Sequence, residues 1–203
     1  MPASRQLAIF GGTFDPVHVG HLIVAEIMRH HLNLEQVVFL PAGRPPHKPD
    51  QILSSDSDRI TMLKLALADA PAFSISTIDI DRPGASYTAD TLRILKEQTG
   101  SDAQLHVLMG QDSLRDFPTW HRPDLIAQLA RIVVALRPGI NISVADIEMA
   151  VPETRDRIDL VPVPLIGISS SDLRAAVRAG GPFRYQVLPS VADYIEDRRL
   201  YRE

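Results

Sequence analysis

Short apolar runs alternate with longer stretches of helical periodicity along most of the chain. The apolar runs predict strands at Leu7–Phe10, Val37–Leu40, Phe73–Ile78, Leu105–Met109, Ile132–Leu136 and Leu160–Val163. The stretches between and after them predict helices at Gly20–His31, Asp56–Asp69, Ala89–Glu97, Arg122–Leu129 and Ser170–Ala179. Strands that alternate with helices pair in parallel through βαβ units. We therefore expect an α/β fold with a Rossmann-like, doubly wound parallel sheet.

The segments outside this alternation are few. Arg137–Asp159 has weak periodicity, and we expect it to be a solvated excursion. The segment Tyr194–Tyr201 predicts an amphipathic closing helix whose role is packing. With 203 residues, the chain is expected to form one domain over residues 1–203, with a small C-terminal helical part at about 168–203.

Composition narrows the class of protein. The chain has no cysteine, which excludes a disulfide framework and a thiolate zinc site. Its formal net charge of −4 argues against non-specific binding to nucleic acid. The longest apolar runs are much shorter than the roughly 20 residues that a membrane span needs. The segment before Gly11 is too short for a signal peptide, so we expect a cytoplasmic protein.

The first candidate for chemistry follows the first predicted strand. Gly11-Gly12-Thr13-Phe14 forms a turn that leads into a helix, where backbone N–H groups can form a concave surface for phosphate. The pattern is neither a Walker loop nor the dinucleotide fingerprint, so alone it is weak evidence. We interpret the nearby Asp15, like Asp90, as a turn or capping residue rather than a catalyst.

A pair of histidines strengthens this site. His18 and His21 are three residues apart at a helix entrance and so lie on one face, while Gly20 is expected to let a ligand approach the backbone. Imidazole N–H donors at a helix N-terminus suit an anion. A metal site built on the two histidines is the rival interpretation, but no third ligand occurs at a nearby spacing.

A second candidate phosphate site occurs near the C-terminus in Gly167-Ile168-Ser169-Ser170-Ser171-Asp172-Leu173-Arg174. Ser169 or Ser170 can cap the helix that follows. Three serines exceed what capping needs, so free hydroxyls, helix-start N–H groups and Arg174 could together hold phosphate. The capping and the phosphate-binding interpretations are equally supported by this segment alone.

Together these segments resemble the HxGH nucleotidyltransferases, and most closely the bacterial nicotinate-nucleotide adenylyltransferases. The resemblance rests on GGTFDPVHVGH at 11–21, PPHK at 45–48, SYTADTL at 86–92, GQDS at 110–113, PTWH at 118–121, ISSSDLR at 168–174 and VADYIEDRRLY at 191–201. Ser171 and Leu173 depart from the usual threonine and isoleucine, and both changes are conservative.

The resemblance implies transfer of an adenylyl group from ATP to nicotinate mononucleotide, giving deamido-NAD and pyrophosphate. It implies catalytic contacts to phosphate from His18, His21, Lys48 and Arg174. It implies that ATP is bound by Gly11, Gly12, Thr13, Phe14, Gly110, Asp112, Ile168, Ser169 and Ser170, with Asp112 accepting from a ribose hydroxyl. It implies that the mononucleotide is bound by Ser86, Tyr87, Thr88 and Trp120.

Residue chemistry agrees with this reaction. A 5′-phosphate nucleophile is already anionic, so the site needs donors and cations rather than a general base. Mg²⁺ is expected to accompany ATP, held by phosphates and water, with no protein ligand. Trp120, the one tryptophan, is expected to stack on the pyridine ring rather than to lie in the core.

Other functions remain open from the sequence. Phosphopantetheine adenylyltransferases share the glycine turn and the chemistry, but lack the PPHK and Trp120 segments. A homologue that prefers the amidated mononucleotide, a silent nucleotide-binding scaffold and a metal-dependent hydrolase are further alternatives. A homo-oligomer is possible.

Overall fold

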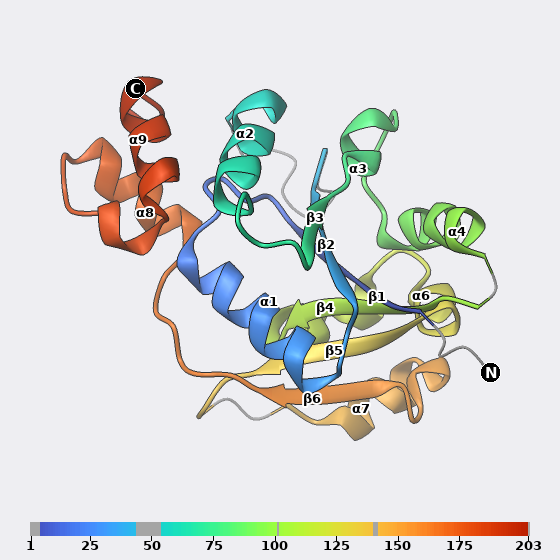
Figure 1. Ribbon diagram of the computed structural model, residues 1–203. Coiled ribbons are helices and arrows are strands. Elements are labelled where there is room, and N and C mark those ends of the chain that lie inside the picture. The colour runs from blue at the N-terminus through green and yellow to red at the C-terminus, as the bar shows by residue number, and fades with distance from the viewer. Residues whose placement is uncertain (1–4, 44–53, 101, 140–141, 203) are drawn as a thin grey trace.

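The computed structural model describes residues 5–43, 54–100, 102–139 and 142–202, and these build a six-stranded parallel sheet with helices on both faces (Figure 1). Every strand pairs in parallel with its neighbours. The strands are β1 (Gln6–Gly12), β2 (Gln36–Pro41), β3 (Phe73–Ile75), β4 (Gln104–Gly110), β5 (Ala130–Leu136) and β6 (Ile158–Pro162). The predicted α/β doubly wound sheet is confirmed.

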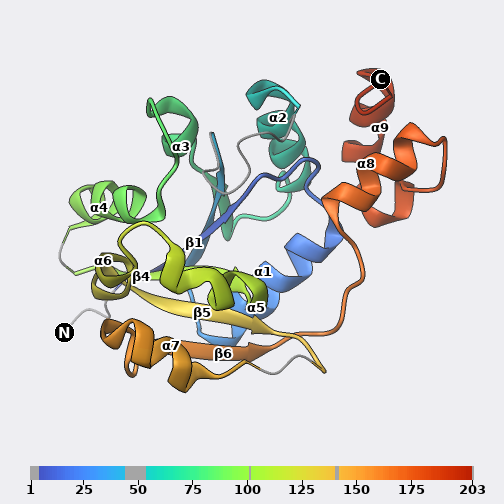
Figure 2. The ribbon, with the colours of Figure 1, turned by 180° about the vertical axis from the view of Figure 1, so that it is seen from behind.

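Helices fill the connections and follow the last strand. The α-helices are α1 (Val19–His31), α2 (Asp56–Ala66), α3 (Ile78–Asp81), α4 (Thr88–Thr99), α5 (Gln111–Asp116), α6 (Pro123–Leu129), α7 (Val144–Ala150), α8 (Ser170–Arg178) and α9 (Pro189–Asp197). α1 crosses one face of the sheet, and α5 crosses the other, as the view from behind shows (Figure 2). Within the described residues, no helix combines the length and apolar character that a bilayer crossing requires.

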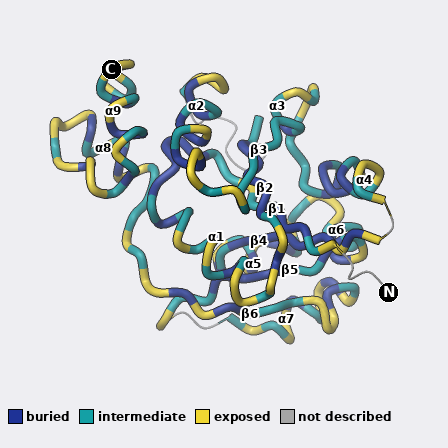
Figure 3. Tube along the Cα trace, viewed as in Figure 1, coloured by how far each residue is buried: buried dark blue, intermediate teal, exposed yellow. Residues whose placement is uncertain are grey.

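The sheet packs against helices through two apolar cores, one on each of its faces. Alternate residues of a strand point to opposite faces, so β1 sends Ala8 into the core under α1 and Ile9 into the core under α4 and α6. Buried residues follow the strands, and exposed ones gather on the outer helical turns (Figure 3). This two-sided burial explains why the strands are apolar almost without interruption.

The strand order β3-β2-β1-β4-β5-β6 places a change of winding direction between β1 and β4. The chain moves outward from β1 through β2 to β3, then returns to pair β4 on the other side of β1. In sheets of this kind, ligands bind outside the carboxyl ends of the strands at such a switch point. Gly12 ends β1 and Gly110 ends β4, so both predicted glycine segments lie there.

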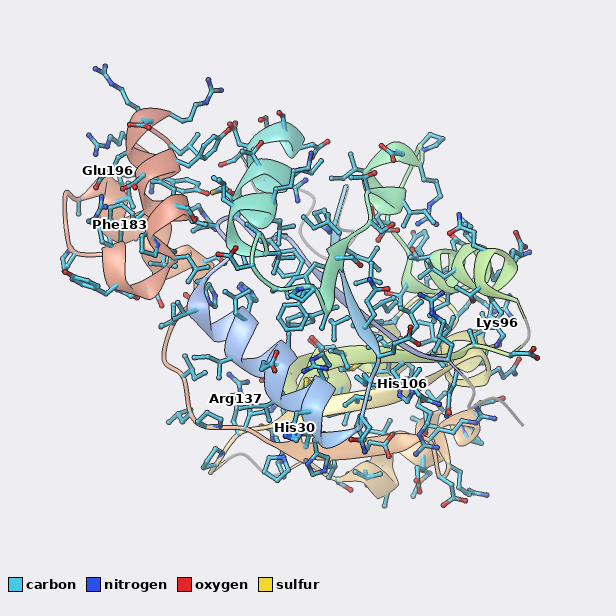
Figure 4. All side chains as sticks on the ribbon, in the orientation of Figure 1. His30, Lys96, His106, Arg137, Phe183 and Glu196 are labelled. Carbon is cyan, nitrogen blue, oxygen red and sulfur yellow. The ribbon has the colours of Figure 1, made fainter. Side chains whose placement is uncertain are left out.

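The C-terminal helices α8 and α9 form a layer beside α2, beyond one end of α1. Phe183, between the two helices, is buried in the core under α1, and α9 contributes the fully buried Val191 and Ile195 (Figure 4 labels Phe183). Arg184 forms ion pairs with Asp193 and Glu196 that join the connecting turn to α9. α9 packs on α2, and Arg174 of α8 donates to the Asp15 carbonyl, so this layer lies next to the turn that follows β1.

Two expectations about local structure were wrong. The predicted strand Phe73–Ile78 ends at Ile75, and Ile78 begins the short helix α3. The segment Arg137–Asp159 is more than a solvated excursion, because it contains α7 and the start of β6, and Ile147 and Val151 are buried against α6. The helices α3 and α7 have only four and seven residues, which is too short for apolar periodicity to reveal them in the sequence.

Candidate active site

A cavity of about 760 Å³ opens at the carboxyl ends of the strands, at the switch point between β1 and β4. Its volume lies in the range typical of small-molecule sites. Its lining includes most of the residues that the sequence analysis proposed: Gly11, Gly12, Thr13, His18, His21, Ser86, Tyr87, Thr88, Gly110, Asp112, Trp120, Ile168, Ser169, Ser170 and Arg174. Residues separated by up to 163 positions are thus gathered around one space.

Two expected residues are not in this lining. Phe14 is 1 % exposed, and its ring packs edge-on against His21 at a centroid distance of 5.1 Å, so it supports the site from below rather than facing a nucleotide. Lys48 lies outside the residues that the structure describes, as does most of its loop.

The nucleotide turn, which we define as residues 11–17, is held from outside by a buried arginine. Arg59 on α2 is 0 % exposed and donates from Nη1 to the Thr13 carbonyl at 2.9 Å. Its Nη2 forms an ion pair with Asp56, which compensates for burying the charge. The turn is therefore fixed before any ligand binds. No sequence pattern predicted the role of Arg59.

The two histidines of the turn-to-helix junction are stacked on each other. Their ring centroids lie 3.7 Å apart with an interplanar angle of 28°. The His18 backbone N–H donates to Nδ1 of His21 at 3.2 Å, which assigns the remaining proton of neutral His21 to Nε2. His21 therefore offers an N–H donor on the side away from the backbone.

Burial keeps both imidazoles uncharged. It lowers the pKa of His18 to about 4, and burial together with the adjacent His18 lowers the pKa of His21 to about 3. At neutral pH in the free protein both histidines are therefore neutral groups that can donate a hydrogen bond, in line with the N–H donors that the sequence analysis expected. Neutral rings can stack closely, whereas two imidazolium ions in this position would repel each other.

Gly20 lines the cavity, and its missing side chain also makes room for a histidine ring. A Cβ at this position would lie 3.0 Å from Nδ1 of His18 and 3.3 Å from Ile166. The missing side chain therefore makes room for the His18 ring and also leaves the backbone open to the cavity.

The start of α8 lines the cavity together with His18 and His21, and we call this end of the cavity, with its N–H and guanidinium donors, the phosphate end. Ser169 caps the helix, since its Oγ accepts from the Asp172 N–H at 3.1 Å. We had expected free serine hydroxyls, and this expectation was wrong for two of them. Ser169 donates to Asp172, and Ser170 donates to the Pro16 carbonyl at 2.9 Å. The groups still available for an anion are the first N–H groups of α8 and the guanidinium of Arg174.

An ion pair lies where β4 and β5 end. Asp112, in the first turn of α5, contacts Nη2 of Arg137 at 2.6 Å through Oδ2. The Asp112 side chain is 64 % exposed, so it remains accessible to a ribose hydroxyl. The sequence analysis missed Arg137. This residue directly follows a predicted strand, and the rule that ligands bind outside the carboxyl ends of the strands could have identified it.

Aromatic rings line the opposite end of the cavity. Trp120 is half-buried, and its ring lies 5.6 Å from the ring of Phe117, so it both faces the cavity and packs against the core. The rings of Tyr87 and His121 lie 4.2 Å apart. This end has flat surfaces for a planar ring and few charges.

A hydrogen-bonded network supports the segment that carries Tyr87. Ser86 accepts from the Gly43 N–H at 3.1 Å and donates to the Asp79 carbonyl at 3.2 Å. The Asp79 side chain accepts from the Thr91 hydroxyl, and burial raises the pKa of its carboxyl group. The network joins the loop after β2 to the start of α4. The sequence analysis did not anticipate Asp79.

Within the described part of the chain, no group of three or more histidine or carboxylate side chains could hold a metal ion. The stacked rings of His18 and His21 face each other, whereas two imidazoles that chelate one ion direct nitrogen atoms to a common point. This arrangement disfavours the hydrolase alternative.

Fold and site together define a nucleotidyltransferase, and comparison with known proteins agrees. The chain belongs to the cytidylyltransferase-like family, whose model matches residues 9–176. Within it the chain belongs with the nicotinate-nucleotide adenylyltransferases. A relative from Thermomicrobium roseum with that name, qualified as probable, is 53 % identical over 197 residues, covering 97 % of this chain and 92 % of the relative. A relative of the same name from Roseiflexus sp. is 43 % identical, covering 98 % of this chain and 100 % of the relative.

Solved structures show the same fold. The nicotinic acid mononucleotide adenylyltransferase of Plasmodium falciparum matches with TM-scores of 0.75 in its complex with APC and 0.76 in its complex with NaAD. Each alignment covers 97 % of both chains at 20 % sequence identity. The predicted family and fold are thus confirmed.

Proposed function

We propose that this chain transfers the adenylyl group of ATP to nicotinate mononucleotide, forming deamido-NAD and pyrophosphate in NAD biosynthesis. The observation that carries the proposal is the division of one cavity into an end rich in anion-binding groups and an aromatic end, at the switch point of the sheet. Relatives up to 53 % identical carry the matching name. The Plasmodium falciparum protein was solved with NaAD, the dinucleotide that this reaction forms.

In the proposed reaction, a 5′-phosphate oxygen of the mononucleotide attacks the α-phosphorus of ATP. The new P–O bond forms as the bond from the α-phosphorus to the bridging oxygen breaks, and pyrophosphate leaves with the electron pair. The nucleophile is anionic at neutral pH, so no side chain has to remove a proton. Catalysis then depends on aligning two polyanions and stabilising negative charge on the leaving group.

The phosphate end is suited to that task. The Nε2–H of His21, the first N–H groups of α8 and the guanidinium of Arg174 line the same part of the cavity. Arg174 donates from Nη1 to the Asp15 carbonyl at 2.7 Å and from Nη2 to the Ser171 hydroxyl at 3.4 Å, and its guanidinium has further N–H groups for phosphate oxygens. Lys48 is proposed to add a further cation.

The aromatic end is proposed to bind the nicotinate ring. Trp120 provides a face on which a cationic pyridinium can stack, a contact worth roughly 1–2 kcal/mol. Backbone N–H groups near Ser86–Thr88 are proposed to meet the carboxylate, and Tyr87 and His121 close the side of the pocket.

Mg²⁺ is proposed to bind with ATP and to neutralise phosphate charge. The cavity lining includes Asp79, Asp112 and Asp116, but among the described residues no group of three or more histidine or carboxylate side chains could hold a metal ion. This donor set fits an ion held by phosphates and water.

Pyrophosphate release with ATP and Mg²⁺ tests the function. Nicotinate mononucleotide, its amide and 4′-phosphopantetheine are compared as acceptors at equal concentration. The proposal predicts the highest kcat/KM with the acid. A preference for phosphopantetheine, or no turnover by folded protein, would contradict it, and equal use of acid and amide would indicate dual specificity.

A further inference from the structure

Asp15, at the centre of the nucleotide turn, connects three segments that are distant in sequence. It is 0 % exposed, and both carboxylate oxygens are occupied: Oδ1 accepts from the Tyr201 hydroxyl at 2.7 Å, and Oδ2 accepts from the Ser54 N–H at 3.1 Å. Its main-chain carbonyl accepts from Arg174 at 2.7 Å. A residue that we had interpreted as a simple turn residue is therefore a junction.

Tyr201 is suited to be a permanent donor at this junction. Burial, together with the negative charge of Asp15, raises the pKa of its phenol, so the hydroxyl keeps its proton throughout the physiological range. The Oη atom also lies 3.8 Å from the sulfur of Met62, on the inner side of α2. Tyr201 thus anchors Asp15 against a rigid helix.

The groups on the other side of Asp15 belong to the phosphate end of the cavity. Arg174 is held by the Asp15 carbonyl, and Ser170 by the carbonyl of the adjacent Pro16. Both side chains come from the first turns of α8. A shift of the Asp15–Pro16 backbone would therefore move the guanidinium and the helix start together.

We propose that Tyr201 is a positioning residue, which acts through Asp15 to hold Arg174 and the start of α8 in the geometry that the phosphate chain requires. This inference rests on the proposed function for its substrates. Tyr201 does not line the cavity, so its effect on catalysis is indirect. The hydroxyl matters because one unsupported oxygen of a buried carboxylate would favour movement of the turn.

The fold supplies a matched control. Tyr194, on the same C-terminal layer, makes the same kind of bond, since its hydroxyl donates to Oδ1 of Asp58 at 2.8 Å. Asp58 lies on α2 and is not part of the cavity lining. Each Tyr→Phe change thus removes one phenol–carboxylate bond, but only Tyr201→Phe removes it from the nucleotide turn. The buried Val191, Ala192 and Ile195 hold α9 in place in both variants.

The test compares wild-type protein with Tyr201→Phe and Tyr194→Phe. For Tyr201→Phe we expect kcat to fall about tenfold, the size of one lost hydrogen bond to a charged group. The KM for the mononucleotide is expected to stay within about twofold, because the aromatic end of the cavity contains none of the residues that are bonded to Asp15. The dissociation constant of inorganic pyrophosphate, measured by calorimetry, is expected to rise severalfold because Arg174 is displaced. Tyr194→Phe is expected to match wild type in all three values, while both variants lose a few degrees in Tm.

Equal kcat and pyrophosphate affinity in Tyr201→Phe and wild type would overturn the inference. So would equal losses in both variants, because that result would indicate general destabilisation. If wild-type protein does not turn over nicotinate mononucleotide, the proposed function fails, but the pyrophosphate comparison still decides whether Tyr201 positions the phosphate end. A double-mutant cycle with Asp15→Asn is expected to be non-additive, and additive losses would exclude a route through Asp15.

Discussion

At the scale of single residues, the site depends on hydrogen-bond direction more than on net charge. His18 and His21 were identified from their spacing, yet their stacked, neutral state depends on burial and on a backbone contact that a sequence does not reveal. For the same reason the sequence analysis did not predict the roles of Arg59 and Asp79, and it interpreted Asp15 only as a turn or capping residue. Each acts through a partner at least 12 positions away, so no local pattern marks it.

Replacement of His21 should affect the chemical step. His21→Ala removes the Nε2–H donor, and we expect kcat to fall by about a hundredfold with little change in KM, as for other donors that stabilise developing charge. Steady-state kinetics at saturating ATP measures this. His30→Ala, an exposed position at the end of α1, is the control and should keep wild-type kcat. Unchanged kcat in His21→Ala would remove the histidine from the mechanism.

Trp120 should govern affinity for the mononucleotide. Trp120→Ala removes the stacking face, and we expect the KM for the mononucleotide to rise roughly tenfold while ATP binding stays near normal. Trp120→Phe, which keeps an aromatic face against Phe117, should recover much of the loss. A selective loss of ATP affinity would count against stacking on the pyridine.

At the scale of elements, the sheet was predictable and several connections were not. The six strands and the helices α1, α2, α4, α6 and α8 were predicted from apolar periodicity, which the two buried faces of the sheet impose. The short helices α3, α5 and α7 have four to seven residues, so tertiary contacts determine them. The function of the start of α8 was ambiguous in the sequence, because a serine hydroxyl can equally well cap a helix or donate a hydrogen bond to a phosphate.

The contact between the loop after β2 and α3 offers a test at this scale. A Cβ on Gly43 would lie 2.3 Å from the Asp79 carbonyl oxygen, so Gly43→Ala must push the two elements apart. We expect a loss of roughly 1–3 kcal/mol in stability and a higher KM for the mononucleotide, because Gly43 also holds Ser86.

Gly181→Ala is the matched control for this change, since its Cβ would make only ordinary contact with Ala176. Denaturant unfolding and KM measurements compare the two variants. Wild-type stability in Gly43→Ala would show that the elements can separate without cost.

At the scale of the whole molecule, the buried histidines couple stability to pH. The pKa of each lies below the usual 6.5 of an unfolded chain, at about 4 for His18 and about 3 for His21. Between pH 6.5 and these values the unfolded state binds more protons, so the contribution of the two histidines to stability is full above pH 6.5 and is lost as pH falls toward about 4 for His18 and about 3 for His21. From pH 7 to 5 the pair should lower the free energy of unfolding by roughly 2–4 kcal/mol.

Urea unfolding at pH 7 and pH 5 measures this coupling. Wild-type protein is compared with a His18→Gln/His21→Gln variant, which retains polar side chains but cannot take up the protons. The loss of stability between the two pH values should be smaller in the variant. Equal losses would assign the acid sensitivity to other groups, such as the buried His106, whose pKa is also lowered by burial.

The bond between Asp15 and Tyr201 also has a consequence for biosynthesis. The two residues are 186 positions apart, and a ribosome that adds roughly 5–20 residues per second needs about 10–40 s to make the intervening chain. During that interval the nucleotide turn exists without its phenol partner and without α8. A nascent chain therefore has the nucleotide turn long before it has a complete site, and the proposed positioning of Arg174 through Asp15 begins only when translation has delivered Tyr201.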